Sequence, residues 1–332
     1  MIAGTVKSFE WANPHAYASV ENDADGRTWR IELVSPSALK QYGWSSSTLA
    51  NGDRVTVTAS PSRNSASSTA FLQSIEKSGK VLYVNPRPVA GAQPPGSAPN
   101  AAAGAAPPSA GPPGSPSPNA AGGRPPDGAP TFRAQSLAGT WVTLPGPALG
   151  QLLNDSFKLP TTPRGAAAIS NFTDAAANPG RDCVPYGVPL YLILPIFRSI
   201  EIGGDAIAIR GEEGGIDRTV HMNRSTHDGA TESLLGDSIG RWEDSALVVD
   251  TARFAEHAMG NAGGLPSSTR KHLVERFELT ADRTALTYTF TLEDPEYLSA
   301  PVQGIARWAY RPDVTYAPIA CNVENARRFL ED

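Results

Sequence analysis

Hydrophobic and polar residues alternate along short stretches of the chain up to residue 88, and this alternation predicts β-strands. Between Thr28 and Val34, for example, Trp29, Ile31 and Leu33 share one face, and the residues between them are polar. A period of two is typical of a strand with one buried face. The other strands predicted in this part of the chain are 4–9, 16–21, 53–59 and 71–75, and a Ser78-Gly79 turn then leads into residues 80–84.

A short helix is predicted over residues 37–42, after the third strand. Ser35 can cap its first turn, Pro36 suits its first position, and Gly43 suits the turn that ends it. Five strands with a helix between the third and the fourth follow the order of an OB-fold barrel. We therefore expect residues 1–88 to form an OB-like domain.

OB folds often bind oligonucleotides or sugars on aromatic side chains. Trp11 and His15 are the candidate ligand-binding residues of this domain, together with Tyr17 and Trp44. The alternative for each of them is packing in the core or at the rim of the barrel.

Residues 89–130 have a composition that cannot build a core. They include 12 Ala, 12 Pro, 8 Gly and 4 Ser, and their only charged residues are Arg124 and Asp127. Such a segment buries too little apolar surface to offset the entropy of ordering. The sequence therefore predicts a disordered Ala/Pro/Gly linker between two domains.

Short alternating segments dominate again after residue 130, with Gly, Asp and Pro between them. They are 199–202, 206–210, 218–223, 246–250, 273–279, 285–292 and 305–310. Many short strands with such turns predict an antiparallel β-barrel or sandwich for residues 131–332. Helices are predicted over 164–177 and 322–330, so the chain as a whole is expected to be mostly β.

Four charged residues fall on apolar faces of the predicted strands of the second domain. They are Glu275, Asp294, Arg218 and Arg224. Because an isolated buried charge is very costly, these groups should pair with one another or line a wet cavity.

These charges have two interpretations. In the first, an arginine–carboxylate network at a barrel mouth fixes the strand register. In the second, they belong to an otherwise apolar pocket, where Arg218 and Arg224 would bind an anionic or carbonyl group. Glu275 or Asp294 would then act as general acid or base. Trp242 follows an arginine and could stack on it at such a site.

His272 completes the candidate catalytic set, although a regular strand points it away from Glu275. A triad of Ser238, His272 and Asp250 can also be composed, but no Gly-x-Ser-x-Gly elbow accompanies it. The five histidines of the chain show no ligand spacing, and no glycine motif for a nucleotide is present. We therefore expect neither a metal nor a cofactor.

The charge balance argues against a nucleic-acid partner. The chain has 28 basic and 33 acidic residues, and residues 1–88 have 9 and 7, so no part is strongly basic. No apolar run approaches the length of a membrane span. The composition does not indicate an oligomeric state.

Two cysteines, Cys183 and Cys321, stand near the two ends of the second domain. A disulfide between them is expected in an oxidising compartment, and two unpaired core cysteines are the alternative. A strand pattern begins at residue 4 without an apolar leader, which taken literally predicts a cytoplasmic protein.

Three segments of the first domain carry a resemblance to a known family. They read GTVKSFEWANPHAY, WRIELVSPSALKQYGW and LANGDRVTVTASPSR. Across residues 3–83 the chain resembles exported bacterial proteins catalogued as domain of unknown function 6152. The resemblance implies a periplasmic or secreted protein and no established activity.

The second domain resembles uncharacterised bacterial proteins, often exported, across residues 181–325. The matching runs include GDSIGRWEDSALVVDTARF, LPSSTRKHLVERFEL and FTLEDPEYLSAP. In those relatives a histidine commonly stands where this chain has Asp237.

The leading functional hypothesis is that the second domain binds a small, partly apolar ligand. The alternatives are a hydrolase, isomerase or lyase that uses a buried carboxylate, and a non-catalytic interaction module at the cell envelope.

Overall fold

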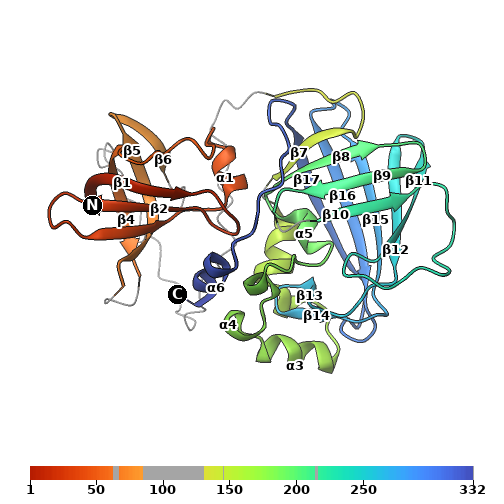
Figure 1. Ribbon diagram of the computed structural model, residues 1–332. Helices are drawn as coiled ribbons and strands as arrows, with labels where there is room; N and C mark the ends of the chain where they lie inside the picture. Colours follow the sequence, from red (N-terminus) through yellow and green to blue (C-terminus); the bar gives the residue numbers. More distant parts are fainter. Residues whose placement is uncertain (63–66, 85–130, 145, 214–215, 332) are drawn as a thin grey trace, which may run out of the picture.

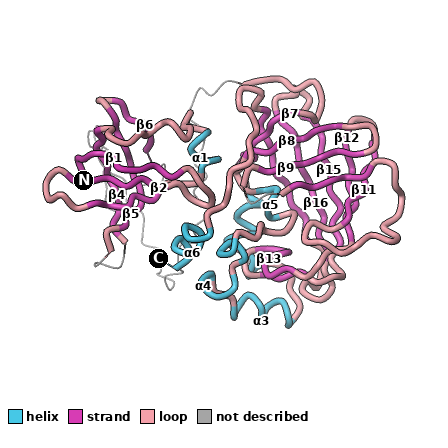
Figure 2. The backbone as a smooth tube through the Cα atoms, viewed as in Figure 1, coloured by secondary structure: helices cyan, strands magenta, loops and turns pink. Residues whose placement is uncertain are grey.

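The computed structural model describes residues 1–62, 67–84, 131–144, 146–213 and 216–331. These residues form two β-barrels, with short helices between them and at one end of the larger barrel (Figure 1 and Figure 2). The mostly β fold predicted from the sequence is confirmed. The predicted disordered linker, 89–130, lies outside the described residues.

The first domain is a five-stranded barrel with one added strand. Its strands are β1 (Ile2–Glu10), β2 (Tyr17–Asn22), β3 (Thr28–Glu32), β4 (Arg54–Pro61), β5 (Thr69–Lys77) and β6 (Lys80–Val84). The barrel follows the order β1-β2-β3-β5-β4, closed by the β4–β1 pair, and only β3 and β5 run parallel. This is the OB order, so the OB-like prediction is confirmed.

Helix α1 (Pro36–Lys40) joins β3 to β4 at the predicted place. The Ser35 hydroxyl accepts a hydrogen bond from the Ala38 N–H at 3.3 Å. Gly43, at φ +79°, supplies the left-handed residue after the helix. Leu39 is fully buried and packs the helix against the core of the barrel.

The second domain is a closed barrel of nine strands. They are β7 (Gly139–Leu144), β8 (Phe197–Ile202), β9 (Ala206–Gly211), β10 (Asp217–His221), β11 (Asp237–Glu243), β12 (Ala246–Ala252), β15 (His272–Leu279), β16 (Ala285–Glu293) and β17 (Val302–Tyr310). Neighbours in the barrel follow this order, and β17 pairs with β7 to close the ring. All the pairs are antiparallel except β10–β11, which is parallel and joins only two residue pairs.

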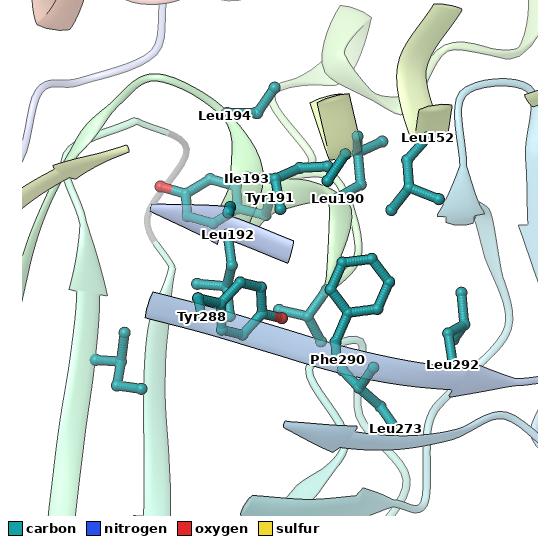
Figure 3. Close-up of a cluster of buried hydrophobic side chains, with 14 of the residues drawn as sticks. Leu152, Leu190, Tyr191, Leu192, Ile193, Leu194, Leu273, Tyr288, Phe290 and Leu292 are labelled. Carbon is teal, nitrogen blue, oxygen red and sulfur yellow. The ribbon is translucent and has the colours of Figure 1, made fainter. Parts of the chain in front are cut away.

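Aromatic and aliphatic side chains fill the second barrel. Trp141, Trp308, Phe277 and Tyr288 are fully buried inside it. Helix α5 (Leu190–Ile193) adds its side chains to this core, and Figure 3 shows them with those of β15 and β16. The hairpin β13 (His257–Ala262) and β14 (Leu265–Ser267) lies at one end of the barrel.

The remaining short helices cover the same part of the second domain. They are α2 (Pro147–Leu149), η1 (Gly150–Asn154), η2 (Ser156–Lys158), α3 (Pro163–Asn171), α4 (Asp174–Ala177) and η3 (Pro179–Asp182). The single helix predicted over 164–177 is thus two helices. Phe172 adopts an extended conformation after α3, and its ring packs against Gly264 of the hairpin. Burial of this ring outweighs the helix propensity of the surrounding alanines.

The two domains are in direct contact. Helix α6 (Val323–Glu331), close to the predicted closing helix, and α1 lie between the two barrels (Figure 1). Hydrogen bonds join the domains at several points, including a bond from the Gln41 side chain to the Pro195 carbonyl at 3.3 Å.

Candidate functional site

A polar network crosses the interior of the second barrel. Arg218 of β10 faces Glu275 of β15, and each side chain is at most 1% exposed. Arg218 Nη1 donates to Glu275 Oε1 at 3.0 Å, and Nη2 donates to Oε2. Arg218 also donates to Ser238 Oγ at 2.9 Å and to Thr251 Oγ1 at 2.7 Å. The Tyr288 hydroxyl donates to Glu275 Oε1 at 2.8 Å.

This network joins five consecutive strands, from β10 to β16, and it spans the short parallel pairing of β10 with β11. Burial by itself would lower the pKa of Arg218, but the Glu275 carboxylate outweighs burial and raises it. Burial raises the pKa of Tyr288 well above its usual value, so this hydroxyl stays protonated and donates. The arrangement matches the first interpretation, a network that fixes strand register; a catalytic role for Glu275 stays a prediction.

Asp294 follows β16 and is 1% exposed, as its strand parity indicates. Its carboxylate accepts hydrogen bonds from Asn261 Nδ2 at 2.9 Å, from the Ser268 N–H at 2.8 Å and from Ser268 Oγ at 2.7 Å. These bonds join the β13–β14 hairpin to the end of β16. Asp294 therefore stabilises the attachment of the hairpin to β16. Its proposed catalytic role stays a prediction.

Strand parity misses a buried lysine close to these groups. Lys271 is 2% exposed and lies in the turn before β15, where no alternation assigns a side chain to a face. Its Nζ donates to the Val188 and Gly260 carbonyls, at 2.5 Å each. Burial lowers the pKa of Lys271 to about 7, although Asp294 and Glu275 oppose this shift.

Arg198 of β8 is a second buried cation that is not among the predicted site residues, and no carboxylate of the described part of the chain lies at salt-bridge distance from it. Its guanidinium donates to Thr143 Oγ1 and to the carbonyls of Tyr191 and Leu194, and it stacks on Trp308 at 4.5 Å. Burial lowers the pKa of Arg198 to about 10. The sequence does contain the signal, because Arg198 shares its parity with Ile200, but the predicted strand begins one residue too late.

The outer side of the second barrel carries a cluster of imidazoles and carboxylates. Its members are His227, His272, Asp237, Asp250, Glu293 and Arg224, and we call it the imidazole–carboxylate cluster. His227 Nδ1 lies 2.7 Å from Asp237 Oδ2, and its Nε2 lies 2.9 Å from Asp250 Oδ1. His272 Nε2 lies 3.0 Å from Asp250 Oδ2.

Arg224 occupies a different place from the one that parity indicates. β10 ends at His221, so the alternation stops before Arg224, which lies in the following loop. There its Nη1 donates to Asp237 Oδ1 at 3.0 Å. Arg218 and Arg224 are therefore not neighbours on one face; the first lies inside the barrel and the second outside.

His227 lies between two carboxylates of the cluster, Asp237 and Asp250. A neutral imidazole has one N–H and one lone pair, so it can donate to only one carboxylate. Both nitrogens of His227 lie at hydrogen-bond distance from carboxylate oxygens, so donation to both carboxylates requires the imidazolium form. Burial would raise the pKa of Asp250, but the bonds from His227 and His272 outweigh it and lower that pKa.

We predict that His227→Ala lowers the free energy of unfolding by about 2 kcal/mol, since it removes the imidazole that contacts both Asp237 and Asp250. Urea denaturation measures the effect. His221→Ala is the matched control, because His221 lies 3.9 Å from Asp237 and is more exposed than His227. Equal losses for the two variants would contradict the prediction.

The same side of the barrel has an open groove of about 630 Å³, which we call the outer groove. Its lining includes Val248, Val274, Ile305, Thr289, Thr291, Gln303, Arg241, Arg276 and Glu243. Strand pairing sets these side chains in two rows across β12, β15, β16 and β17. One row is Val248, Arg276, Thr289 and Ile305, and the other is Asp250, Val274, Thr291 and Gln303. Asp250 therefore belongs both to the second row and to the imidazole–carboxylate cluster.

The composed triad is only partly assembled. Asp250 and His272 are in contact, but Ser238 is 1% exposed and binds Arg218 inside the barrel. Trp242 is 46% exposed and lies on β11 between Arg241 and Glu243, which both line the outer groove. Its role in binding stays a prediction.

In the first domain, the two candidate ligand-binding residues have protein partners. Trp11 packs against Phe9, with ring centroids 5.8 Å apart. His15 is buried, and its Nδ1 lies 2.7 Å from Glu32 Oε1. A ligand-binding role for either residue stays a prediction.

The predicted disulfide is present. Cys183 and Cys321 are bonded, with their Cα atoms 5.9 Å apart and 138 positions apart in sequence. Among the residues that the structure describes, no three His, Cys, Asp or Glu side chains are grouped so that they could hold a metal ion. Over the same residues, no helix has the length and apolar character needed to cross a membrane.

Comparison with known proteins gives information on the first domain. No curated protein matches the chain. Residues 1–71 match the model of a family described as Family of unknown function (DUF6152). The resemblance seen in the sequence of the first domain is therefore confirmed over residues 1–71.

Proposed function

We propose that the second domain binds a small, partly apolar ligand in the outer groove. The observation that carries the proposal is the groove itself, because its volume of about 630 Å³ lies in the range of small-molecule sites. The barrel interior is an inferior candidate, since large aromatic side chains and the Arg218–Glu275 network fill it.

The lining of the outer groove suits a ligand with both apolar and polar parts. Val248, Val274 and Ile305 provide apolar contact surface, whereas Thr289, Thr291 and Gln303 provide hydrogen-bonding groups. Arg276 and Arg241 lie at the rim, and Glu243 is bonded to both of them. These two arginines, rather than the saturated Arg218, are the cations available to an anionic group of a ligand.

A charged side chain in place of Ile305 is expected to close the groove to such ligands. We predict that Ile305→Glu weakens binding of anilinonaphthalene sulfonate, an apolar anion, roughly tenfold, because it removes apolar contact and adds like charge. Fluorescence titration measures the affinity. Ile305 is 50% exposed, so the substitution leaves the core intact.

Ile202→Glu is the matched control for this experiment. Ile202 is 41% exposed on β8 and does not belong to the lining of the groove. Its substitution should leave the affinity unchanged. Equal binding by the wild type and both variants would show that the probe does not use the outer groove, and the proposal would be rejected.

General acid–base catalysis on the bound ligand is the second candidate function. His272 favours it, because this imidazole is oriented by Asp250 and shares the outer face of β15 with Val274 of the groove. Native mass spectrometry before and after denaturation can identify a co-purified ligand. If His272 is catalytic, His272→Gln should bind that molecule and fail to convert it.

We also propose that the protein acts in the periplasm or outside the cell. The Cys183–Cys321 disulfide supports this location, because disulfides persist in oxidising compartments. Thiol alkylation of the protein in its native host, without prior reduction, tests the location. Labelling of both cysteines would indicate a reducing compartment instead.

A further inference from the structure

The first domain receives an extended piece of the second domain at its Asn-Pro-His motif. Asn13 forms a parallel β-bridge with Cys321. The Asn13 N–H donates to the Ala320 carbonyl at 3.0 Å, and the Asn322 N–H donates to the Asn13 carbonyl at 2.8 Å. Asn13 Nδ2 adds a bond to the Ile319 carbonyl at 3.0 Å. Asn13 is 3% exposed, so these bonds form away from water.

The contact continues at the start of α6. Arg30 Nη2 donates to Asn325 Oδ1 at 2.6 Å, and Asn325 Nδ2 donates to Glu10 Oε2 at 3.2 Å. The first domain thus holds residues 319–325 through their backbone and through a side chain, and we call these residues the clasp segment.

A second group of contacts between the domains is centred on Glu212, whose carbonyl also accepts a hydrogen bond from the N–H of Ile319, the first residue of the clasp segment, at 2.9 Å. Lys40 Nζ lies 2.5 Å from Glu212 Oε1, and Ser37 Oγ donates to Glu212 Oε2 at 3.1 Å. Glu212 belongs to the second domain just after β9. These contacts use neither Asn13 nor Cys321, so they provide the association between the domains that remains when the disulfide is reduced or Asn13 is replaced.

Within the clasp segment, Cys321 provides a covalent cross-link to the rest of the second domain, through the disulfide of its side chain with Cys183. Its partner Cys183 follows η3, and both cysteines are half-buried, within reach of solvent. The backbone of Cys321 pairs with Asn13 of the first domain, while its sulfur is bonded to Cys183. The disulfide therefore holds Cys321 in the position in which its backbone pairs with Asn13 of the first domain.

We propose that the Cys183–Cys321 disulfide is a redox-controlled clasp that holds the two domains together through Asn13. With the bond intact, the clasp segment is ordered before the first domain binds it, so binding costs little conformational entropy. With the bond broken, the segment must be ordered during binding, and the affinity between the domains falls.

The switching reaction is thiol–disulfide exchange with a dithiol. One thiolate of the dithiol attacks a sulfur of the Cys183–Cys321 bond and forms a mixed disulfide, releasing the other cysteine as a thiolate. The second thiol of the reagent then displaces the remaining cysteine. The protein gains two electrons and two protons as its S–S bond becomes two thiols, and the dithiol becomes a disulfide.

Cleavage of the full chain between the domains tests the proposal. A protease recognition sequence is inserted within residues 89–130, the oxidised protein is cut, and association of the halves is measured by size-exclusion chromatography over a dilution series. We expect the oxidised halves to remain together and dithiothreitol to raise their Kd roughly tenfold. Halves that separate when oxidised, or whose Kd is the same in both redox states, would overturn the proposal.

Asn13→Ala tests the clasp with the disulfide intact, so it does not depend on the fold of a reduced protein. We expect a rise in Kd of roughly tenfold, because the substitution leaves the Ile319 carbonyl without its side-chain donor, while the two backbone bonds of residue 13 remain. Asn51→Ala, in an exposed turn of the same domain, is the control and should have the wild-type Kd. A wild-type Kd for Asn13→Ala would contradict the clasp.

Linkage provides an independent readout in the uncut protein. If the oxidised segment binds the first domain more tightly, the first domain must stabilise the disulfide by the same factor. Asn13→Ala should therefore raise the equilibrium constant for reduction of the Cys183–Cys321 bond in dithiothreitol buffers roughly tenfold. An unchanged constant would refute the coupling, even if Asn13 contributes to the interface.

Discussion

Replacing Glu275 by glutamine is expected to lower the free energy of unfolding by about 3–5 kcal/mol, because it leaves Arg218 charged and unpaired inside the barrel. The pair is at most 1% exposed, and two of the Arg218 donors point at the carboxylate. Water cannot replace the lost anion in this interior. Urea denaturation monitored by circular dichroism measures the loss.

Glu293→Gln is the control for this substitution. Glu293 lies on the same sheet, but its side chain is 51% exposed and faces His272 at 3.5 Å. Exposed ion pairs contribute at most about 1 kcal/mol, so Glu293→Gln should be nearly neutral. If the two substitutions lower the free energy of unfolding by the same amount, the Arg218–Glu275 pair does not stabilise the barrel as proposed.

The double substitution Arg218→Met with Glu275→Leu separates the ion pair from the space it fills. Removing both charges avoids an unpaired ion, and buried pairs can be replaced by apolar residues at little cost. We expect the double variant to be more stable than Glu275→Gln. Because Tyr288 loses its bond to Glu275, and Ser238 and Thr251 lose their bonds to Arg218, full recovery is not expected.

Stability is also expected to rise between pH 7 and pH 9.5, by about 3 kcal/mol from Lys271. Burial lowers the pKa of Lys271 to about 7 in the folded protein, whereas an unfolded lysine has a pKa near 10.4. Within this window the unfolded chain binds more protons than the folded one. Raising the pH therefore removes a cost that only the folded state bears.

Lys271→Met should abolish most of this rise, and Lys158→Met should preserve it, because Lys158 is 64% exposed. Thermal or urea unfolding at several pH values between 7 and 9.5 gives the slopes. Higher pH is avoided because burial raises the pKa of Tyr191 and Tyr288, which then favours the unfolded state. A wild-type slope for Lys271→Met would contradict the assignment.

Strand alternation carries much of the fold and of the barrel interior. It places Glu275 and Arg218 on inward faces, and it does the same for Asp294; all three are buried. The order of strands and helix in residues 1–88 predicts the OB arrangement because local turns and caps, such as Ser35, are encoded by neighbouring residues. Two cysteines leave a single possible pairing, so the disulfide could also be anticipated.

Parity fails where a strand ends or a loop begins. Arg224 lies beyond the end of β10 and reaches Asp237 on the outside, whereas Lys271 enters the core from a turn. The position of Lys271 depends on the Val188 and Gly260 carbonyls, which come from distant parts of the chain. Sequence periodicity describes only neighbouring residues, so it cannot predict these contacts of Lys271.

The groove and the domain contact are properties of the assembled chain. The outer groove requires the pairing of β12, β15, β16 and β17 to bring Val248, Val274 and Ile305 together. The β-bridge between Asn13 and Cys321 joins residues more than 300 positions apart. The two β-domains, the faces of their strands and the cysteine pair could be predicted from the sequence, because they depend on local periodicity and composition. The pairing of charges, the outer groove and the contact between the domains depend on long-range strand register, so they could be read only from the folded chain.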